Sequence, residues 1–206
     1  MRARKIDLDK VQEDALQELC NIGMGHATTA LAQLVGKTIF FDVPRVTKSE
    51  ISRIPDMIGK PEEIVVGIYL RFQGQITGNI LFIFPKESAL LLREIITGIK
   101  SQELIFDDYQ TSLLKEVGNI LTGSYLSVME KLLGMRLVQS VPWFAFDLAS
   151  AIIDPILIQL GKDTDHIVVV EAEFFVRENK ELRGKFYLLP DPTSIRLMLK
   201  ALGLGD

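Results

Sequence analysis

The chain has 206 residues, of which 48% are hydrophobic and 24% are charged, so it can fill a globular core and general disorder is excluded. Its net charge of −4 and the lack of a basic block argue against nucleic acid as a partner. The single cysteine, Cys20, excludes an internal disulfide. With only His26 and His166 beside it, a metal site built from Cys and His ligands is not expected.

No segment has the composition of a secretory or membrane-spanning sequence. The N-terminus becomes charged over residues 6–10 before any apolar region can form. The least charged long segment, residues 137–160, contains Pro142, Asp147, Asp154 and Pro155, which a membrane span tolerates poorly. We therefore expect a cytoplasmic protein with no membrane partner.

Helices alternate with β-rich segments along the whole chain. The first half predicts a helix over 8–35, a strand over 38–46, a polar connection over 47–61, strands over 63–72 and 76–84, and a helix over 86–97. The second half predicts a helix over 107–133, a strand over 136–142, a helix over 143–160, strands over 167–177 and 181–189, and a helix over 191–202. Helices combined with antiparallel hairpins indicate an α+β fold.

The order of these elements reflects an internal repeat. The segment Asp14-Ala-Leu-Gln-Glu18-Leu-Cys-Asn21-Ile22 resembles Ser112-Leu-Leu-Lys-Glu116-Val-Gly-Asn119-Ile120, 98 residues later. The same offset relates Gly25 to Gly123, Leu34 to Leu132, Gly36 to Gly134 and Pro44 to Pro142. Later in each half, residues 64–66 resemble 167–169, and residues 81–85 resemble 186–190. We expect one internally duplicated, pseudo-two-fold, two-layer α+β domain of two repeats, about 1–105 and 106–206, with two long helices packed on antiparallel strands.

Each long helix carries a similar set of polar residues and a glycine on one face. At about 100° per residue, Asp14, Glu18, Asn21 and Gly25 fall within about 60° of one another. We call these four residues the first polar stripe, and Ser112, Glu116, Asn119 and Gly123 the second polar stripe. The opposite faces are apolar and predict burial of Leu16, Leu19, Ala27, Ala30 and Leu34 in the first helix, and of Leu114, Val117, Leu121, Tyr125, Val128 and Leu132 in the second.

A solvated helix face explains a single Glu, but it explains the Asn and Gly less well. Asn is a mediocre helix former, and a Gly in the middle of a helix costs about 1 kcal/mol relative to Ala. A Gly on the stripe removes a side chain and lets another protein approach closely. The stripes therefore indicate docking faces that carry a carboxylate and an amide.

The spacing around the stripes is similar to a known signature. An Asp or Ser four residues before Glu-x-x-Asn, followed by Pro after 22 intervening residues, resembles the signature of the CheC/CheX/FliY family, whose members are phosphatases of the phosphorylated chemotaxis response regulator. Pro44 completes the first match and Pro142 the second, and the length is nearest to that of the CheC branch. The family often has Asn where this chain has His26, which lies off the stripe and which we interpret as a structural variant.

The resemblance implies a role for each residue of the stripes. An aspartyl phosphate is already reactive, so a phosphatase needs only to place water in line and to manage charge. Asn21 and Asn119 would orient the water, and Glu18 and Glu116 would engage the regulator's Lys. Asp14 and Ser112 would steady the Glu or the docking, and the prolines would end or kink a strand. No cofactor of its own is implied, because the Mg²⁺ belongs to the regulator, the CheY-type partner whose motor signal is ended.

A binding function without catalysis is the alternative. Members of the family bind CheD, a receptor-modifying deamidase, through the helix after the second proline, and Asp147 within 146–153 matches that region. The stripes of such a protein would only dock CheD or a regulator. Intact Glu and Asn in both halves favour the enzyme. The aromatic residues nearby, Trp143, Phe144 and Phe146, are expected in the core, as is Cys20.

Overall fold

The computed structural model describes residues 8–58, 60–99, 106–161, 164–176 and 182–205. The elements of the first half are α1 (Lys10–Val35), β1 (Ile39–Phe41), β2 (Arg45–Glu50), η1 (Ile51–Arg53), α2 (Ile54–Ile58), β3 (Ile64–Gly74), β4 (Gly78–Pro85) and α3 (Lys86–Thr97). Those of the second half are α4 (Asp108–Leu133), β5 (Leu137–Gln139), β6 (Trp143–Leu148), α5 (Ala149–Leu160), β7 (His166–Val176), β8 (Arg183–Pro190) and α6 (Pro192–Ala201).

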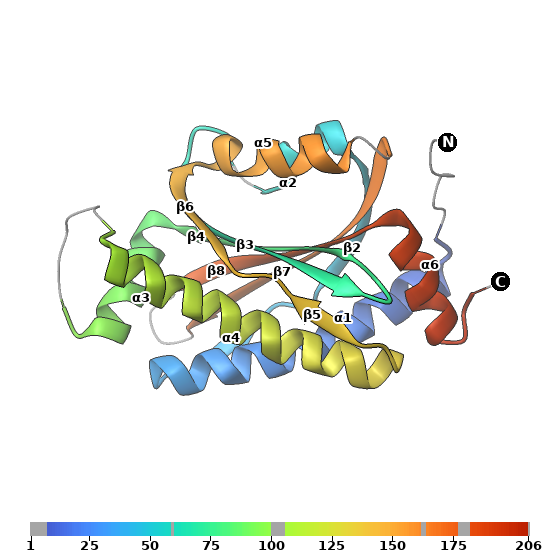
Figure 1. The fold of residues 1–206 in the computed structure, drawn as a ribbon, viewed down its shortest axis with the longest axis horizontal. Coiled ribbons are helices and arrows are strands. Elements are labelled where there is room, and N and C mark those ends of the chain that lie inside the picture. Colours follow the sequence, from blue (N-terminus) through green and yellow to red (C-terminus); the bar gives the residue numbers. More distant parts are fainter. Residues whose placement is uncertain (1–7, 59, 100–105, 162–163, 177–181, 206) are drawn as a thin grey trace.

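One curled antiparallel sheet forms the middle of the molecule (Figure 1). The long helices α1 and α4 lie side by side on one face, where α3 and α6 join them around the larger core. The short α2 and the longer α5 cover the other face over a second, smaller core. The expected α+β fold with two long helices on antiparallel strands is therefore confirmed, and α2 with α5 adds a further partial layer.

The strand order is symmetric: it reads the same from either edge of the sheet when each strand is replaced by its counterpart in the other half. The order is β1-β7-β8-β4-β3-β5, with β2 also on β7 and β6 also on β3. Phe72 of β3 pairs with Gly78 and with Gln139, and Phe174 of β7 pairs with Gly184 and with Phe41. Two repeats related by an axis between β4 and β8 would produce this pattern. The duplication stays a prediction on this support, and its expected boundary at 105/106 falls at the edge of the described residues.

The same register corrects the expected match between the central strands. Ile39 pairs with Val176 and Leu137 pairs with Gly74, so β7 follows β3 at 102 residues and not at the 103 taken from the sequence. Val66 thus corresponds to Val168, and both face the larger core. The sequence match was wrong because these buried strands are continuous apolar runs. Shifting the alignment of two such strands by one residue does not change their apolar pattern.

Three predicted elements differ from the structure. The strand over 38–46 is two strands, β1 and β2, with Pro44 between them, and the connection over 47–61 contains the rest of β2, η1 and α2. The helix over 143–160 begins as β6, which pairs with β3 along its length, and only then becomes α5. Strand pairing therefore decides the conformation of a segment whose composition alone allows a helix.

The two long helices begin and end in the same way. At the start of α1, the Asp9 side chain accepts a hydrogen bond from the Gln12 backbone at 2.9 Å, and the Asp9 backbone N–H donates one to Gln12 Oε1 at 3.2 Å. At the start of α4, the Asp107 side chain accepts from the Gln110 backbone at 2.7 Å. Glycines in the left-handed region end both helices, Gly36 at φ 66° and Gly134 at φ 65°. These caps and glycines therefore set where each long helix begins and ends.

The helix faces are buried largely as the sequence predicts. The larger core takes the apolar faces of α1 and α4, with Cys20 and Tyr125 fully buried, but Leu34 and Leu132 are 38% and 43% exposed. Both leucines lie in the last turn of their helix, where the buried neighbours Val35 and Leu133 take the place in the core. Among the aromatic residues after Pro142, Phe144 and Phe146 pack on Phe106, whereas Trp143 is 48% exposed on the edge strand β6. None of the helices that the structure describes is long and apolar enough to span a membrane.

Candidate active site

Both polar stripes lie outside the core, on the outer faces of α1 and α4. The carboxylate residues Glu18 and Glu116 are exposed, and the amide residues Asn21 and Asn119 are partly buried. Neither Asn is enclosed in the core, as the sequence predicts.

The second polar stripe borders a hollow of about 440 Å³. One wall is α4, and the other is the segment that follows β5 and turns at Pro142. The residues that line the hollow are Ser112, Lys115, Glu116, Asn119, Gln139, Ser140, Val141 and Pro142. The fold thus brings Ser112, Glu116, Asn119 and Pro142 of the signature to one place, although the proline lies 23 residues after the Asn.

Hydrogen bonds hold the Asn119 side chain at this hollow. Its Nδ2 donates to Glu116 Oε2 at 3.4 Å. Its Oδ1 accepts a hydrogen bond from Gln139 Nε2, which also donates to the Asn119 backbone carbonyl at 3.2 Å. Gln139 ends the short strand β5 and was not predicted from the sequence, because the signature lies on the helix and the proline alone. Only the strand register could have placed it beside Asn119.

The first polar stripe is more open. The Asp14 carboxylate pairs with Lys10 Nζ at 2.9 Å and raises the pKa of that ammonium group, mainly through their hydrogen bond. Within the described part of the chain, no hydrogen bond holds the side chain of Glu18 or Asn21. Phe41 takes the place of Gln139, because it pairs with Phe174 as Gln139 pairs with Phe72.

The supporting residues contact the preceding turn and not the Glu. Ser112 Oγ donates to the Asp108 carbonyl at 2.7 Å, and Asp14 is taken by Lys10. The expectation that these two residues steady Glu18 and Glu116 is therefore not met, and a docking role stays a prediction. A Cβ on Gly25 would have nothing within 4 Å, whereas one on Gly123 would lie 3.7 Å from Gln139 Oε1. A partner can thus approach the helix backbone closely at Gly25, while Gln139 covers Gly123.

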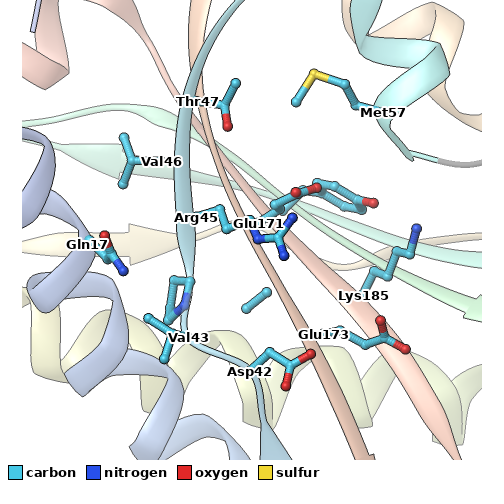
Figure 2. Close-up of a pocket in the computed structure, with 13 residues that line it drawn as sticks. Gln17, Asp42, Val43, Arg45, Val46, Thr47, Met57, Glu171, Glu173 and Lys185 are labelled. Carbon is cyan, nitrogen blue, oxygen red and sulfur yellow. The ribbon is translucent and has the colours of Figure 1, made fainter.

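A larger hollow of about 870 Å³ lies beside the corresponding segment of the first half, but no residue of the first polar stripe lines it. Gln17 of α1 and the segment around Pro44 line it, as Lys115 and Pro142 line the other hollow. Figure 2 shows Gln17 on one side of this segment and charged side chains of the sheet on the other. The charged residues are Asp42, Arg45, Glu171, Glu173 and Lys185. The two corners therefore correspond at Gln17 and at the segment around Pro44, but they differ in charge and extent, and only the second hollow is lined by its polar stripe.

The remaining candidates have structural surroundings. His26 is exposed and α1 runs through it without a break, so this variant does not disturb the helix. Cys20 Sγ accepts a hydrogen bond from the Tyr125 hydroxyl at 3.1 Å, and burial raises the pKa of the thiol to about 12. Asp147 is exposed in β6 and not on a helix, and its Oδ1 accepts from the Leu148 backbone at 2.7 Å. In the described ranges no three His, Cys, Asp or Glu residues gather in a way that could hold a metal.

Comparison with known proteins agrees with this arrangement. The model of the CheC-like family matches residues 11–47 and 110–144, which are the two stripe helices with the segments up to the prolines. The protein named CheY-P phosphatase CheC from Bacillus subtilis (strain 168) is 34% identical over 196 residues, covering 93% of this chain and 94% of that protein. The chain belongs to the CheC-like family.

Solved structures share the fold at lower identity. The crystal structure of Thermotoga maritima FliY has a TM-score of 0.76 at 20% identity, over 98% of this chain and 100% of that one. A chain in the crystal structure of the CheX–CheY–BeF3–Mg²⁺ complex from Borrelia burgdorferi has a TM-score of 0.56 at 15% identity, over 82% of this chain and 96% of that one. These likenesses establish the fold and leave the chemistry to be argued from the site.

Proposed function

We propose that this protein is a hydrolase that removes the phosphoryl group from the aspartyl phosphate of a CheY-type response regulator. The observation that carries the proposal is the hollow beside α4, where the side chains of Glu116 and Asn119 lie together on an outer helix face. Family membership supports the same activity, since a 34% identical relative is named a CheY-P phosphatase.

The reaction itself asks little of the enzyme. Water attacks phosphorus in line, the bond between phosphorus and the aspartyl oxygen breaks, and phosphate and a free carboxylate result. Asn21 and Asn119 orient the water, because a neutral amide both donates and accepts hydrogen bonds without repelling the phosphoryl group. Glu18 and Glu116 pair with the regulator's Lys and set the register of docking. The regulator carries its own Mg²⁺, so the protein supplies no cofactor.

The two amides are the first test of this proposal. The double variant Asn21→Ala/Asn119→Ala should lose the phosphatase activity, while each substitution changes stability by no more than about 0.5 kcal/mol, because neither residue is in the core. The assay follows loss of phosphate from a phosphorylated chemotaxis regulator, with circular dichroism as the control for folding. Full activity of the folded double variant would show that the amide does not orient the water.

The roles of Glu and Asn can be separated by kinetics. Glu18→Gln and Glu116→Gln should raise KM and lower kcat, since the charge that docks the regulator is lost. Asn→Ala should mainly lower kcat, because it removes little contact with the ground state. The docking loss should shrink as salt rises, because exposed ion pairs are screened. The opposite result, in which Asn variants change only KM and Glu variants change only kcat, would reverse the assignment.

A second candidate function is the binding of CheD near Asp147. Asp147 is exposed at the end of β6, and Leu148 beside it is 40% exposed, so an acidic and an apolar side chain are offered together. Asp147→Arg should then abolish co-purification with CheD and leave the phosphatase assay unchanged. CheD binding by the Asp147→Arg protein at native affinity would remove this candidate.

A further inference from the structure

The two polar stripes differ in what holds their amide. Gln139 Nε2 donates to both oxygens of Asn119, the side-chain Oδ1 and the backbone carbonyl. At the corresponding position of the first half, Phe41 offers no hydrogen bond and packs against the larger core. Asn119 is thus held from the strand side, whereas within the described residues no partner holds Asn21.

We propose that Gln139 is a positioning residue, which fixes the orientation of the Asn119 carboxamide in the second site and has no counterpart in the first. The inference rests on the proposed function, because the oriented amide is the group that would bind the attacking water. Gln139 does not touch the reacting atoms in this scheme and acts only through Asn119.

The donors and acceptors define a single orientation of the amide. With Oδ1 facing Gln139, Nδ2 faces the Glu116 carboxylate. Rotating the carboxamide by half a turn would set Nδ2 against the Nε2 donor and Oδ1 against a carboxylate oxygen, so both hydrogen bonds would be lost. The second hydrogen on Nδ2 is then available to donate to the attacking water at the hollow. Orientation before the reaction lowers the entropy that must be lost on the way to the transition state.

The fold itself does not require a polar residue at this position. Phe41 fills the same place in the first half, next to Phe174 where Gln139 lies next to Phe72. Gln139 Oε1 is buried and has no hydrogen-bond partner within the described residues. An unpaired buried oxygen destabilises a fold. An apolar residue that only packed here would avoid that cost. The presence of Gln139 is therefore explained by its Nε2, which donates to Asn119.

The test uses two backgrounds in which one site is active. In Asn21→Ala only the second site works, and in Asn119→Ala only the first. Gln139→Met keeps the side-chain length without the hydrogen bonds, and Gln139→Glu keeps the shape but replaces the donor by an acceptor. Val138→Ala is the matched control, since Val138 lies next to Gln139 in β5 and is 61% exposed. Each protein is assayed for kcat and KM with the phosphorylated regulator.

In the Asn21→Ala background, Gln139→Met and Gln139→Glu should lower kcat about three- to ten-fold with KM unchanged, the loss expected when one side chain becomes free to rotate. Val138→Ala should change neither constant. In the Asn119→Ala background, Gln139→Met should leave kcat as it was, because no amide is left for it to orient. An equal fall of kcat in both backgrounds would overturn the positioning role and indicate a general effect on folding.

A measurement without substrate separates this inference from the proposed function. The side-chain amide of Asn119 should be more ordered than that of Asn21 in ¹⁵N relaxation, and Gln139→Met should reduce the order of Asn119 alone. Equal order of the two amides in the native protein would overturn the inference, whatever the assay shows. An ordered Asn119 together with an inactive Asn21→Ala protein would instead overturn the catalytic use of the second site, and the catalytic part of this inference with it.

Discussion

The two polar stripes share a sequence pattern, but the strand corners beside them differ. The second corner supplies Gln139, which holds its amide, and Lys115 lines its hollow. The first corner has Phe41 and Gln17 at these positions, and an acidic residue, Asp42, where the second has Ser140. The helix motif therefore determines that a Glu and an Asn are present at each site. The neighbouring strand determines which side chains hold them and which charges lie nearby.

The long helices diverge in the core in a complementary way. Tyr125 of α4 is fully buried, and a Cβ on Gly23 of α1 would lie 2.6 Å from its ring. At the offset of 98 residues, Tyr125 corresponds to Ala27 in α1, and Gly23 corresponds to Leu121 in α4. One large residue thus fits against a glycine of the other helix, while the two corresponding positions carry a small and a medium-sized buried residue. Close packing therefore requires that Tyr125 and Gly23 be matched to each other in size.

The largest effect should come from removing Tyr125. Tyr125→Ala leaves a cavity between α1 and Phe186, whose ring lies 4.9 Å from that of Tyr125, and should lower the free energy of unfolding by about 3–5 kcal/mol. Tyr125→Phe keeps the ring and loses only the hydrogen bond to Cys20, so it should cost about 1 kcal/mol. Urea denaturation measures both. Similar losses for the two variants would show that the hydroxyl, and not the volume, matters here.

Two glycines two residues apart on α1 provide the next comparison. Gly23→Ala should destabilise the protein by about 1–3 kcal/mol, because the new methyl meets the Tyr125 ring. Gly25→Ala meets nothing within 4 Å and should raise stability by up to about 1 kcal/mol through helix propensity alone. If Gly25 serves close docking, Gly25→Ala should also raise KM of the first site. A destabilised Gly25→Ala protein would contradict the open surface described here.

Much of this could be predicted from the sequence, because helix phase is a local property. The spacing of Glu18 and Asn21, repeated at Glu116 and Asn119, predicts that both pairs lie on outer faces, whereas only the structure places Pro142 at the second hollow. These predictions rest on about 100° per residue and on helix ends that the caps define.

The rest depended on pairing between distant segments. Gln139 meets Asn119 only because β5 pairs with β3 in one register, and a run of apolar residues does not specify that register. The sequence predicts a helix where β6 lies for the same reason, since the partner strand β3 lies some 80 residues earlier in the chain. The catalytic roles themselves remain predictions, to be decided by the kinetic variants.

A smaller effect should follow from Cys20, for which Gly118 is the counterpart without an ionisable group. Burial raises the pKa of the thiol to about 12 in the folded state. The stabilisation that comes from keeping the thiol protonated is therefore fully present below pH 9, near the pKa of the unfolded chain, and is lost as the pH rises toward 12. Between pH 7.5 and 9.5 stability should fall by about 1 kcal/mol more in the native protein than in Cys20→Ala. Equal pH dependence of the two proteins would mean that the thiol ionises freely in the folded state.

The smallest predicted effect tests the difference in charge between the two corners. Lys115 lines the second hollow beside Asn119, and Gln17 is its counterpart in the first half. A phosphorylated aspartyl surface is anionic, so Lys115→Gln in the Asn21→Ala background should raise KM about two- to three-fold at low salt. Gln17→Lys in the Asn119→Ala background should lower KM by a similar factor. Both changes should shrink as salt rises, because exposed charges are screened beyond about 10 Å at 0.1 M. Lys131→Gln, an exposed charge in the last turn of α4, controls for the net charge of the protein. An equal effect of Lys131→Gln would mean that overall charge, and not the corner beside each stripe, distinguishes the two sites.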